Sequence, residues 1–381
     1  MVAIQGLVGL RPAPEHVAHV TAPPYDVIKE GSPLAARIRD EPRSITHITL
    51  GKDPAGALKT LRESGALIDD DEASHYVYEQ TWNAEAGEER RVGVFTAVHV
   101  SEYSEQNIIR HEKTFDEKVA GRIGLCEATG HVIGPIFLLT KAPLGVLLEE
   151  YAKSEPLYDF VSDFGPGTDL DGVRQRVWKV PATDTRLAHV LAKDPLYIAD
   201  GHHRYHAALK GGLSHTLAYV TEDAKIQAYN RVLTGEKTFA DAKNDLELTP
   251  TSSFVTPAKN EFCIYTREGT FMAKAKEVPD DVVGRLDCSI LEREFYPAFG
   301  LEHRHVVMEK HFDYYPESAL HTMKEVVDAK TYDVAIALHP VSTDELLAVA
   351  DAGLIDSNVV MPEKSTFFSP KILTGLFLQR V

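Results

Sequence analysis

Cysteine and tryptophan are scarce in this chain of 381 residues, which holds three cysteines and two tryptophans. Cys126, Cys263 and Cys288 lie far apart and form no CxxC pair. This spacing argues against a disulfide framework and against a zinc site made of thiolates. The cysteine usage is typical of a reducing compartment.

Long apolar runs are also missing, since no stretch reaches the roughly 18 residues of a membrane-spanning helix. The opening MVAIQGLVGLRPAPEHV is interrupted by Gly, Arg and Pro. It lacks the charged start and the long apolar core of a secretory signal. We therefore expect a cytoplasmic protein with no membrane partner.

Basic residues are outnumbered, 40 against 57 acidic ones, and the formal net charge is −17. An acidic body binds nucleic acid poorly, because phosphates must be neutralised by a basic face. A local basic pocket on an acidic surface still permits a small anionic ligand. We expect a small-molecule substrate, no nucleic acid and, as an open possibility, a homodimer.

Short apolar stretches alternate with helical ones along the chain, which predicts a mixed α/β (α+β) fold. The length allows roughly two or three domains, and the polar, proline-containing stretch 223–260 predicts a boundary between domains 1–225 and 226–381. The predicted strands are 75–81, 91–100, 131–139, 158–163, 174–180, 195–200, 215–221 and 332–339. The predicted helices are 54–66, 143–153, 203–210, 288–298, 316–328 and 343–352.

The strongest chemical signal is the segment LYIADGHHRYHAAL, in which an apolar strand is followed by a helix. Asp200 ends the strand, and Gly201 permits a tight turn and close approach of a ligand. The first N–H groups of a helix attract anions, and Arg204 can bind a phosphate through two parallel hydrogen bonds. His202 and His203 add donors or move a proton. The alternative is a plain helix cap with solvated histidines.

Metal hypotheses for this segment are weaker. His202 and His206 are four residues apart, but a zinc site would need a third ligand that the sequence does not reveal. A Mg²⁺ ion held by Asp200 and by substrate phosphates is more plausible, because this ion rarely needs an all-protein site.

Three other segments carry candidate residues. Arg110-His111-Glu112-Lys113-Thr114 combines a possible general base, Glu112, with cations, although such a cluster is more often a solvated loop. The C-terminal MPEKSTFFSPK supplies Lys364 and Lys371 but lacks the glycines of a Walker motif. Near the start, two prolines stiffen the loop that presents Tyr25 and Asp26, which suits either a binding site or a simple turn. GxSxG and GxGxxG are absent, so hydrolase and dinucleotide-binding hypotheses have no support.

Together these segments resemble a widespread bacterial family known as a conserved domain of unknown function. The matching stretches are APPYDV at 22–27, HEKT at 111–114, ADGHHR at 199–204 and MPEKSTFFSPKILTG at 361–375. ADGHHR is also similar to the phosphate-binding turn of the ParB/sulfiredoxin-like fold, which includes free serine kinases. The resemblance implies a ParB/sulfiredoxin-like core with a C-terminal α/β extension that closes over the site, bringing 361–371 near 200–204.

The resemblance implies a small-molecule kinase that acts on free L-serine with ATP, ADP or pyrophosphate as donor and Mg²⁺ as cofactor. Its catalytic residues would be Glu112, Asp200, His202 and His203. Donor phosphates would contact Gly201, Arg204, Lys364, Ser365, Thr366, Lys371, Arg122 and Arg231, and the substrate would contact Tyr25, Asp26, His111 and Thr114. One departure is Asn230, where the family tends to have a histidine before the arginine.

Two other functions remain possible at this stage. One is a nucleotide- or phosphate-binding switch without turnover, which predicts nucleotide-dependent dimerisation. The other is redox repair, as in sulfiredoxin, but that chemistry needs a nucleophilic cysteine in the phosphate turn. The turn here holds His202 and His203 instead.

Overall fold

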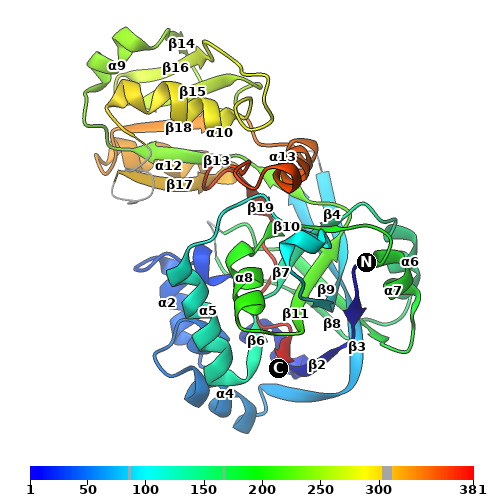
Figure 1. The fold of residues 1–381 in the computed structure, drawn as a ribbon. Coiled ribbons are helices and arrows are strands. Elements are labelled where there is room, and N and C mark those ends of the chain that lie inside the picture. The colour runs from blue at the N-terminus through cyan, green and yellow to red at the C-terminus, as the bar shows by residue number, and fades with distance from the viewer. Residues whose placement is uncertain (85–86, 166–167, 303–310) are drawn as a thin grey trace. The chain divides into compact units, whose positions relative to one another are not determined.

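A computed structural model describes residues 1–84, 87–165, 168–302 and 311–381 (Figure 1). The chain divides into two compact units. Unit 1 comprises Met1–Ala224 together with Pro370–Val381, and unit 2 comprises Lys225–Ser369. The last twelve residues, which the sequence analysis grouped with 226–381, thus return to unit 1.

Unit 1 is built on a large curled sheet whose main strand order is β5-β10-β7-β11-β4-β3-β2-β20-β6. Its strands are β1 (Ile4–Gln5), β2 (Leu7–Pro12), β3 (Leu67–Ala84), β4 (Gly87–His99), β5 (Ile108–Ile109), β6 (His131–Ile133), β7 (Ile136–Thr140), β8 (Tyr158–Val161), β9 (Arg174–Pro181), β10 (Leu196–Asp200), β11 (His215–Thr221) and β20 (Leu378–Arg380). The central strands are buried on both faces, as β7 shows with all of its residues buried.

The helices of unit 1 are α1 (Val17–Val20), α2 (Pro33–Asp40), α3 (Thr46–Thr49), α4 (Pro54–Glu63), α5 (Asp116–Thr129), α6 (Gly145–Tyr151), α7 (Arg186–Leu191) and α8 (His202–Lys210). Short 3₁₀ turns occur at η1 (Pro14–His16), η2 (Tyr25–Val27) and η3 (Tyr103–Glu105). Helices α5 and α8 pack side by side (Figure 1). Tyr205 and Ala208 of α8 join the core formed by Leu138, Ile198 and Val220 of the sheet. This packing fixes where α8 begins, next to the end of β10.

Unit 2 contains an antiparallel sheet with the strand order β14-β16-β15-β18-β13-β17 and a separate pair, β12 and β19. The strands are β12 (Lys225–Gln227), β13 (Tyr229–Leu233), β14 (Thr249–Thr251), β15 (Glu261–Thr266), β16 (Gly269–Lys274), β17 (Phe312–Pro316), β18 (Val334–Leu338) and β19 (Phe367–Ser369). The helices are α9 (Phe239–Asp245), α10 (Asp287–Ile290), α12 (Leu320–Asp328) and α13 (Thr343–Ile355), with a π-helix at Leu291–Phe295 and 3₁₀ turns at Pro297–Phe299 and Glu317–Ala319.

Helix and strand are equally abundant, which confirms the predicted mixed class. Several boundaries differ from the prediction. The predicted strand 131–139 is split at Gly134, whose φ of 85° breaks it into β6 and β7. The predicted helix 316–328 begins only at Leu320, because Pro316 still belongs to β17. In the part of the chain that the structure describes, no helix is both long and apolar enough to cross a membrane.

Candidate functional site

The turn between β10 and α8 depends on a glycine. Gly201 is the N-cap of α8 with a φ of 95°, a conformation that L side chains rarely adopt. A Cβ at this position would lie 3.0 Å from Nε of Arg204, because the guanidinium folds back over the turn. Among the residues that the structure describes, no side chain caps α8, so a capping residue does not satisfy its first N–H groups. The turn therefore leaves donors at the positive end of the helix.

Asp200 is held between two cations. Its Oδ2 lies 3.3 Å from Nη2 of Arg204 and 3.6 Å from Nζ of Lys371. Burial opposes ionisation, but the two cations hold the pKa of Asp200 well below its usual value. The carboxylate is thus charged at neutral pH.

Both cations are fixed by further contacts. Arg204 donates through Nη1 to the carbonyl of Pro135. The backbone N–H of Lys371 donates to Asp169 at 2.8 Å, and its carbonyl accepts from Gln80 at 3.0 Å. The sequence predicted that the C-terminal motif approaches Asp200, and Lys371 does so as part of unit 1. Gln80 and Asp169 were not predicted, because nothing in their local sequence signals a contact with Lys371.

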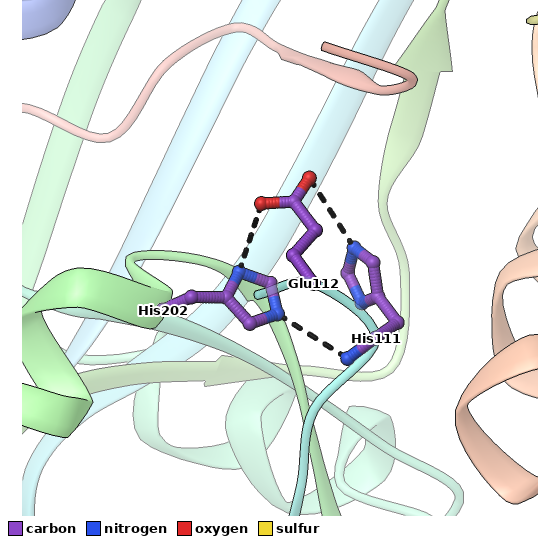
Figure 2. A group of neighbouring side chains, drawn as sticks. All are labelled: His111, Glu112 and His202. Carbon is purple, nitrogen blue, oxygen red and sulfur yellow. Dashed lines mark hydrogen bonds and ion pairs between the residues drawn. The ribbon is translucent and has the colours of Figure 1, made fainter. Parts of the chain in front are cut away.

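Parallel strand pairing brings a second group to the same place. β5 pairs with β10 in parallel, with Ile108 opposite Leu196 and Ile109 opposite Tyr197. His111 and Glu112 follow β5, just as His202 follows β10, and the carboxyl ends of parallel strands lie at the same edge of a sheet. Figure 2 shows the result, in which the Glu112 carboxylate lies between the two imidazole rings.

Glu112 and His202 are in direct contact. Oε2 of Glu112 lies 3.3 Å from Nδ1 of His202, and the backbone N–H of His111 points at Nε2 of His202 at 3.4 Å (Figure 2). Nε2 must therefore present its lone pair, which assigns the proton of the neutral ring to Nδ1. The Nδ1–H group of His202 accordingly lies next to the Glu112 carboxylate. Burial lowers the pKa of His202 well below its usual value, so the ring is neutral at pH 7.

His111 is fully buried rather than exposed to solvent. Its ring meets the His202 ring edge-on, with centroids 4.5 Å apart, and its Nε2 lies 3.8 Å from Oε1 of Glu112. Burial lowers the pKa of His111 to about 4. Two neutral imidazoles thus flank the Glu112 carboxylate, whose side chain is 29% exposed.

His111, Glu112 and His202 are also the candidate metal-binding group among the described residues, with ligand atoms all within 4.8 Å of one another. The hydrogen bond from His111 argues against such a site in this arrangement. A metal bound at Nδ1 of His202 needs the lone pair there, whereas the proton occupies that nitrogen. His206, the alternative zinc ligand, stacks on Tyr103 with centroids 6.0 Å apart and is not a member of this group.

The remaining predicted residues of unit 1 contact neither Asp200 nor Glu112 in the interactions described for this part of the chain. His203 stacks on Phe115, with centroids 5.7 Å apart. The Arg122 guanidinium lies 4.1 Å from the centroid of the Tyr25 ring. Asp26 is exposed and Thr114 is half-buried.

Four predicted phosphate ligands belong to unit 2. Arg231 donates to the Tyr296 hydroxyl at 3.1 Å and to the Tyr229 carbonyl, and it lies 4.7 Å from the Tyr314 ring centroid. Lys364 has a φ of 56° and lies 5.7 Å from the Tyr229 ring. Ser365 is buried, and its hydroxyl donates to Pro362, while Thr366 is half-buried.

Comparison with known families decides the affiliation of the chain. The family model DUF1015, described as a protein of unknown function, matches residues 4–289. The chain belongs to this family. The match contains Glu112 and the Asp200–Arg204 turn, and it ends before the C-terminal motif. No curated protein matches the chain.

Several solved structures share a limited likeness with this DUF1015 protein. A free serine kinase in complex with AMP is 14% identical, with a TM-score of 0.39, and the match covers 72% of this chain and 86% of that one. A conserved hypothetical protein from Pyrococcus furiosus is 14% identical, with a TM-score of 0.35, over 74% and 92% of the two chains. C-terminally truncated SbnI from Staphylococcus aureus is 11% identical, with a TM-score of 0.38, over 73% and 85%.

Proposed function

We propose that this protein is a phosphotransferase that moves a phosphoryl group from a nucleotide or pyrophosphate to the hydroxyl group of a small molecule, with free L-serine as the acceptor. The observation that carries the proposal is the pairing of Glu112 with His202 beside the N-terminus of α8. It combines a carboxylate base, anion-binding N–H groups and buried cations in unit 1. Phosphoryl transfer needs mainly positioning and electrostatic stabilisation, and these groups supply both.

Each group has a role in the proposed reaction. Glu112 accepts the proton of the serine hydroxyl as its oxygen forms a bond to the transferred phosphorus and the bond to the donor oxygen breaks. His202 holds the carboxylate in place through Nδ1–H. The N–H groups at Gly201–Arg204 and the ammonium of Lys371 stabilise the phosphate oxygens.

Asp200 has a second proposed role. Its Oδ2 takes both ion pairs, so Oδ1 is the oxygen that would bind Mg²⁺ together with the donor phosphates. Bound Mg²⁺ would neutralise charge on those phosphates. His203, Arg122, Lys364, Ser365 and Thr366 stay proposed contacts of the donor, whereas the contacts of Arg231 within unit 2 favour a structural role. Tyr25, Asp26, His111 and Thr114 stay proposed contacts or supports of the acceptor, and the ParB/sulfiredoxin-like core belongs to the same proposal.

The test is direct detection of phosphoserine. Purified protein is incubated with L-serine, Mg²⁺ and ATP, ADP or pyrophosphate in turn, and products are followed by ³¹P NMR. E112Q should lower kcat by about 10²- to 10⁴-fold, the usual contribution of a general base, with little change in donor binding. E117Q, at an exposed position in the first turn of α5, is the matched control and should keep full activity.

Three outcomes would contradict parts of the proposal. Absence of phosphoserine with every donor rejects serine as acceptor. An E112Q variant as active as E117Q rejects Glu112 as the base. Donor binding without turnover of any hydroxyl substrate would favour a nucleotide- or phosphate-binding switch, which sizing chromatography with and without nucleotide would test as a change in dimerisation.

A further inference from the structure

Arg91 is a buried arginine close to the strand that carries Asp200. It belongs to β4 and is 2% exposed. Its guanidinium lies 5.0 Å from the centroid of the Phe137 ring. Phe137 is opposite Asp200 where β7 pairs with β10, and residues opposite each other in an antiparallel pair have Cβ atoms about 4.5–5.5 Å apart. Arg91 is therefore a near neighbour of the proposed phosphate site.

The guanidinium of Arg91 is only partly satisfied. Its Nη2 donates to Oε1 of Gln80 and to the carbonyl of Pro370. In the described chain, Nε and Nη1 have no hydrogen-bond partner, and no acidic side chain forms an ion pair with Arg91. Burial of a charge without a counter-charge is costly, so stability alone would favour a neutral side chain here. Because Nε and Nη1 are too enclosed to reach a ligand, Arg91 can act only through the two acceptors of Nη2.

Both of these acceptors are connected to Lys371. Nε2 of Gln80 donates to the Lys371 carbonyl at 3.0 Å. The Pro370 carbonyl and the Lys371 N–H belong to one peptide group, whose oxygen accepts from the guanidinium and whose N–H donates to Asp169 at 2.8 Å. The peptide groups before and after Lys371 are thus both fixed. The ammonium of this lysine lies 3.6 Å from Oδ2 of Asp200.

Gln80 can make this connection because its side chain is an amide. The Arg91 guanidinium only donates, so it requires the amide oxygen, and the Lys371 carbonyl only accepts, so it requires the amide nitrogen. The two contacts together assign the orientation of the amide. An ionised glutamate at this position would accept from Arg91 but could not donate to Lys371.

We propose that Arg91 and Gln80 are positioning residues for the donor phosphates. They fix the main chain at Pro370 and Lys371, and they thereby hold the Lys371 ammonium beside Asp200, where it binds a phosphate. The inference rests on the proposed function, in which Lys371 contacts the donor. Neither Arg91 nor Gln80 touches the ligand. Their substitution should therefore weaken donor binding and leave the KM for serine unchanged.

The variant Q80E separates this role from a general contribution to stability. Glutamate supplies Arg91 with a counter-charge, so the urea midpoint of unfolding should stay close to that of the unmodified protein. The hydrogen bond to the Lys371 carbonyl is lost at the same time. We expect isothermal titration in the presence of Mg²⁺ to show at least tenfold weaker binding of pyrophosphate. The KM for ATP should rise as well.

The reactivity of the Lys371 amine measures its position without any assay of activity. Competitive acetylation with acetic anhydride, followed by mass spectrometry, gives the rate for each lysine. Lys371 is 8% exposed and ion-paired, so it should react slowly in the unmodified protein and at least tenfold faster in Q80E. Lys59, whose side chain is 74% exposed, is the internal reference and should react equally fast in both proteins.

Two neighbouring arginines provide a matched pair of variants. Arg90, the preceding residue of β4, is 38% exposed and pairs with Glu79 and Glu149. R91M should weaken pyrophosphate binding and speed the acetylation of Lys371 as Q80E does, whereas R90M should do neither. Because methionine removes a buried charge that lacks a counter-charge, R91M should fold even if Q80E does not.

The results separate this inference from the proposed function. Faster acetylation of Lys371 together with weaker pyrophosphate binding in R91M would support the positioning role, even if the unmodified protein makes no phosphoserine. Phosphoserine formation, with unchanged acetylation of Lys371 or unchanged pyrophosphate affinity in R91M, would overturn the positioning role and leave the phosphotransferase intact. An equal loss of pyrophosphate affinity in R90M and R91M would also overturn it.

Discussion

Two buried cations, Lys371 of unit 1 and Arg231 of unit 2, are compensated in different ways. In unit 1, Lys371 is 8% exposed and shares the carboxylate of Asp200 with Arg204. In unit 2, Arg231 is 2% exposed and contacts a tyrosine hydroxyl, a backbone carbonyl and an aromatic ring. The Lys371 ammonium is thus compensated by a carboxylate, and the Arg231 guanidinium is stabilised by neutral dipoles.

The difference bears on function. Asp200 brings Arg204 and Lys371 together beside the N-terminus of α8, and its side chain is still 27% exposed. The N–H groups of Arg231 instead bond to groups that hold β13 and the π-helix segment together. We therefore expect the cations of unit 1 to act in binding, and Arg231 to act chiefly in stability.

The largest effect should come from removing the shared carboxylate. D200N removes the carboxylate that Lys371 and Arg204 share, and breaking a buried ion pair in this way costs about 3–5 kcal/mol. R231M removes a cation that has neutral partners, so it should cost less, about 1–3 kcal/mol for the groups left unbonded. Urea denaturation measures both changes in the free energy of unfolding.

Donor binding provides a second test of the difference between Asp200 and Arg231. D200N should abolish Mg²⁺-dependent donor binding, whereas R231M should retain it if the role of Arg231 is structural. An R231M variant that folds normally but no longer binds donor would show that Arg231 is a phosphate ligand after all. Equal stability of D200N and the unmodified protein would show that burial of the two cations does not require the charge of Asp200.

The next largest effect should be a loss of stability of unit 1 at acidic pH. His75 and His111 are buried, and burial lowers the pKa of each to about 4. A histidine in the unfolded chain has a pKa near 6.5. Between pH 6.5 and 4 the unfolded chain therefore binds protons that the folded chain does not bind. The free energy of unfolding should therefore fall as pH drops through this window, by up to about 3 kcal/mol for a histidine shifted this far.

Hydrogen exchange at pH 7, 6, 5 and 4.5 would locate this loss. Peptides from β3, β5 and α8 should lose protection first, because the described histidines with lowered pKa all belong to unit 1. H111Q should flatten the pH dependence, whereas H189Q, at an exposed position in α7, should not. Earlier loss of protection in unit 2 would contradict the assignment.

The sequence was most informative where a strand is apolar and continuous. The predicted strand 215–221 is β11 without change, and 195–200 differs from β10 by one residue. Interruptions within an element were not predicted. A single glycine splits the predicted strand 131–139. The helix predicted at 288–298 consists of α10 followed by a π-helix and a 3₁₀ turn.

The candidate site was foreseeable residue by residue but not as an arrangement. Asp200 and Glu112 were selected for their chemistry, yet their proximity depends on β5, a strand of only two residues that carries no clear periodic signal. The pairing of His202 with the backbone of His111 spans 91 positions. Contacts of this range arise from strand order, which a single sequence does not encode locally.

The smallest predicted effect concerns the turn at Gly201. Gly212, just beyond the other end of α8, provides the control position. Gly201 and Gly212 flank this helix with φ values of 95° and 68°, so alanine at either position adopts a disfavoured backbone conformation, at about 1 kcal/mol. At Gly212 nothing lies within 4 Å of the added Cβ, whereas at Gly201 the Cβ meets Arg204 at 3.0 Å. G201A should therefore lower the free energy of unfolding by roughly 1 kcal/mol more than G212A does, since crowding forces a side-chain shift. G201A alone should also weaken donor binding, because the shift moves Arg204 away from Asp200. Isothermal titration of both variants tests this, and equal donor affinity in G201A and G212A would mean that the position of Arg204 does not matter for binding.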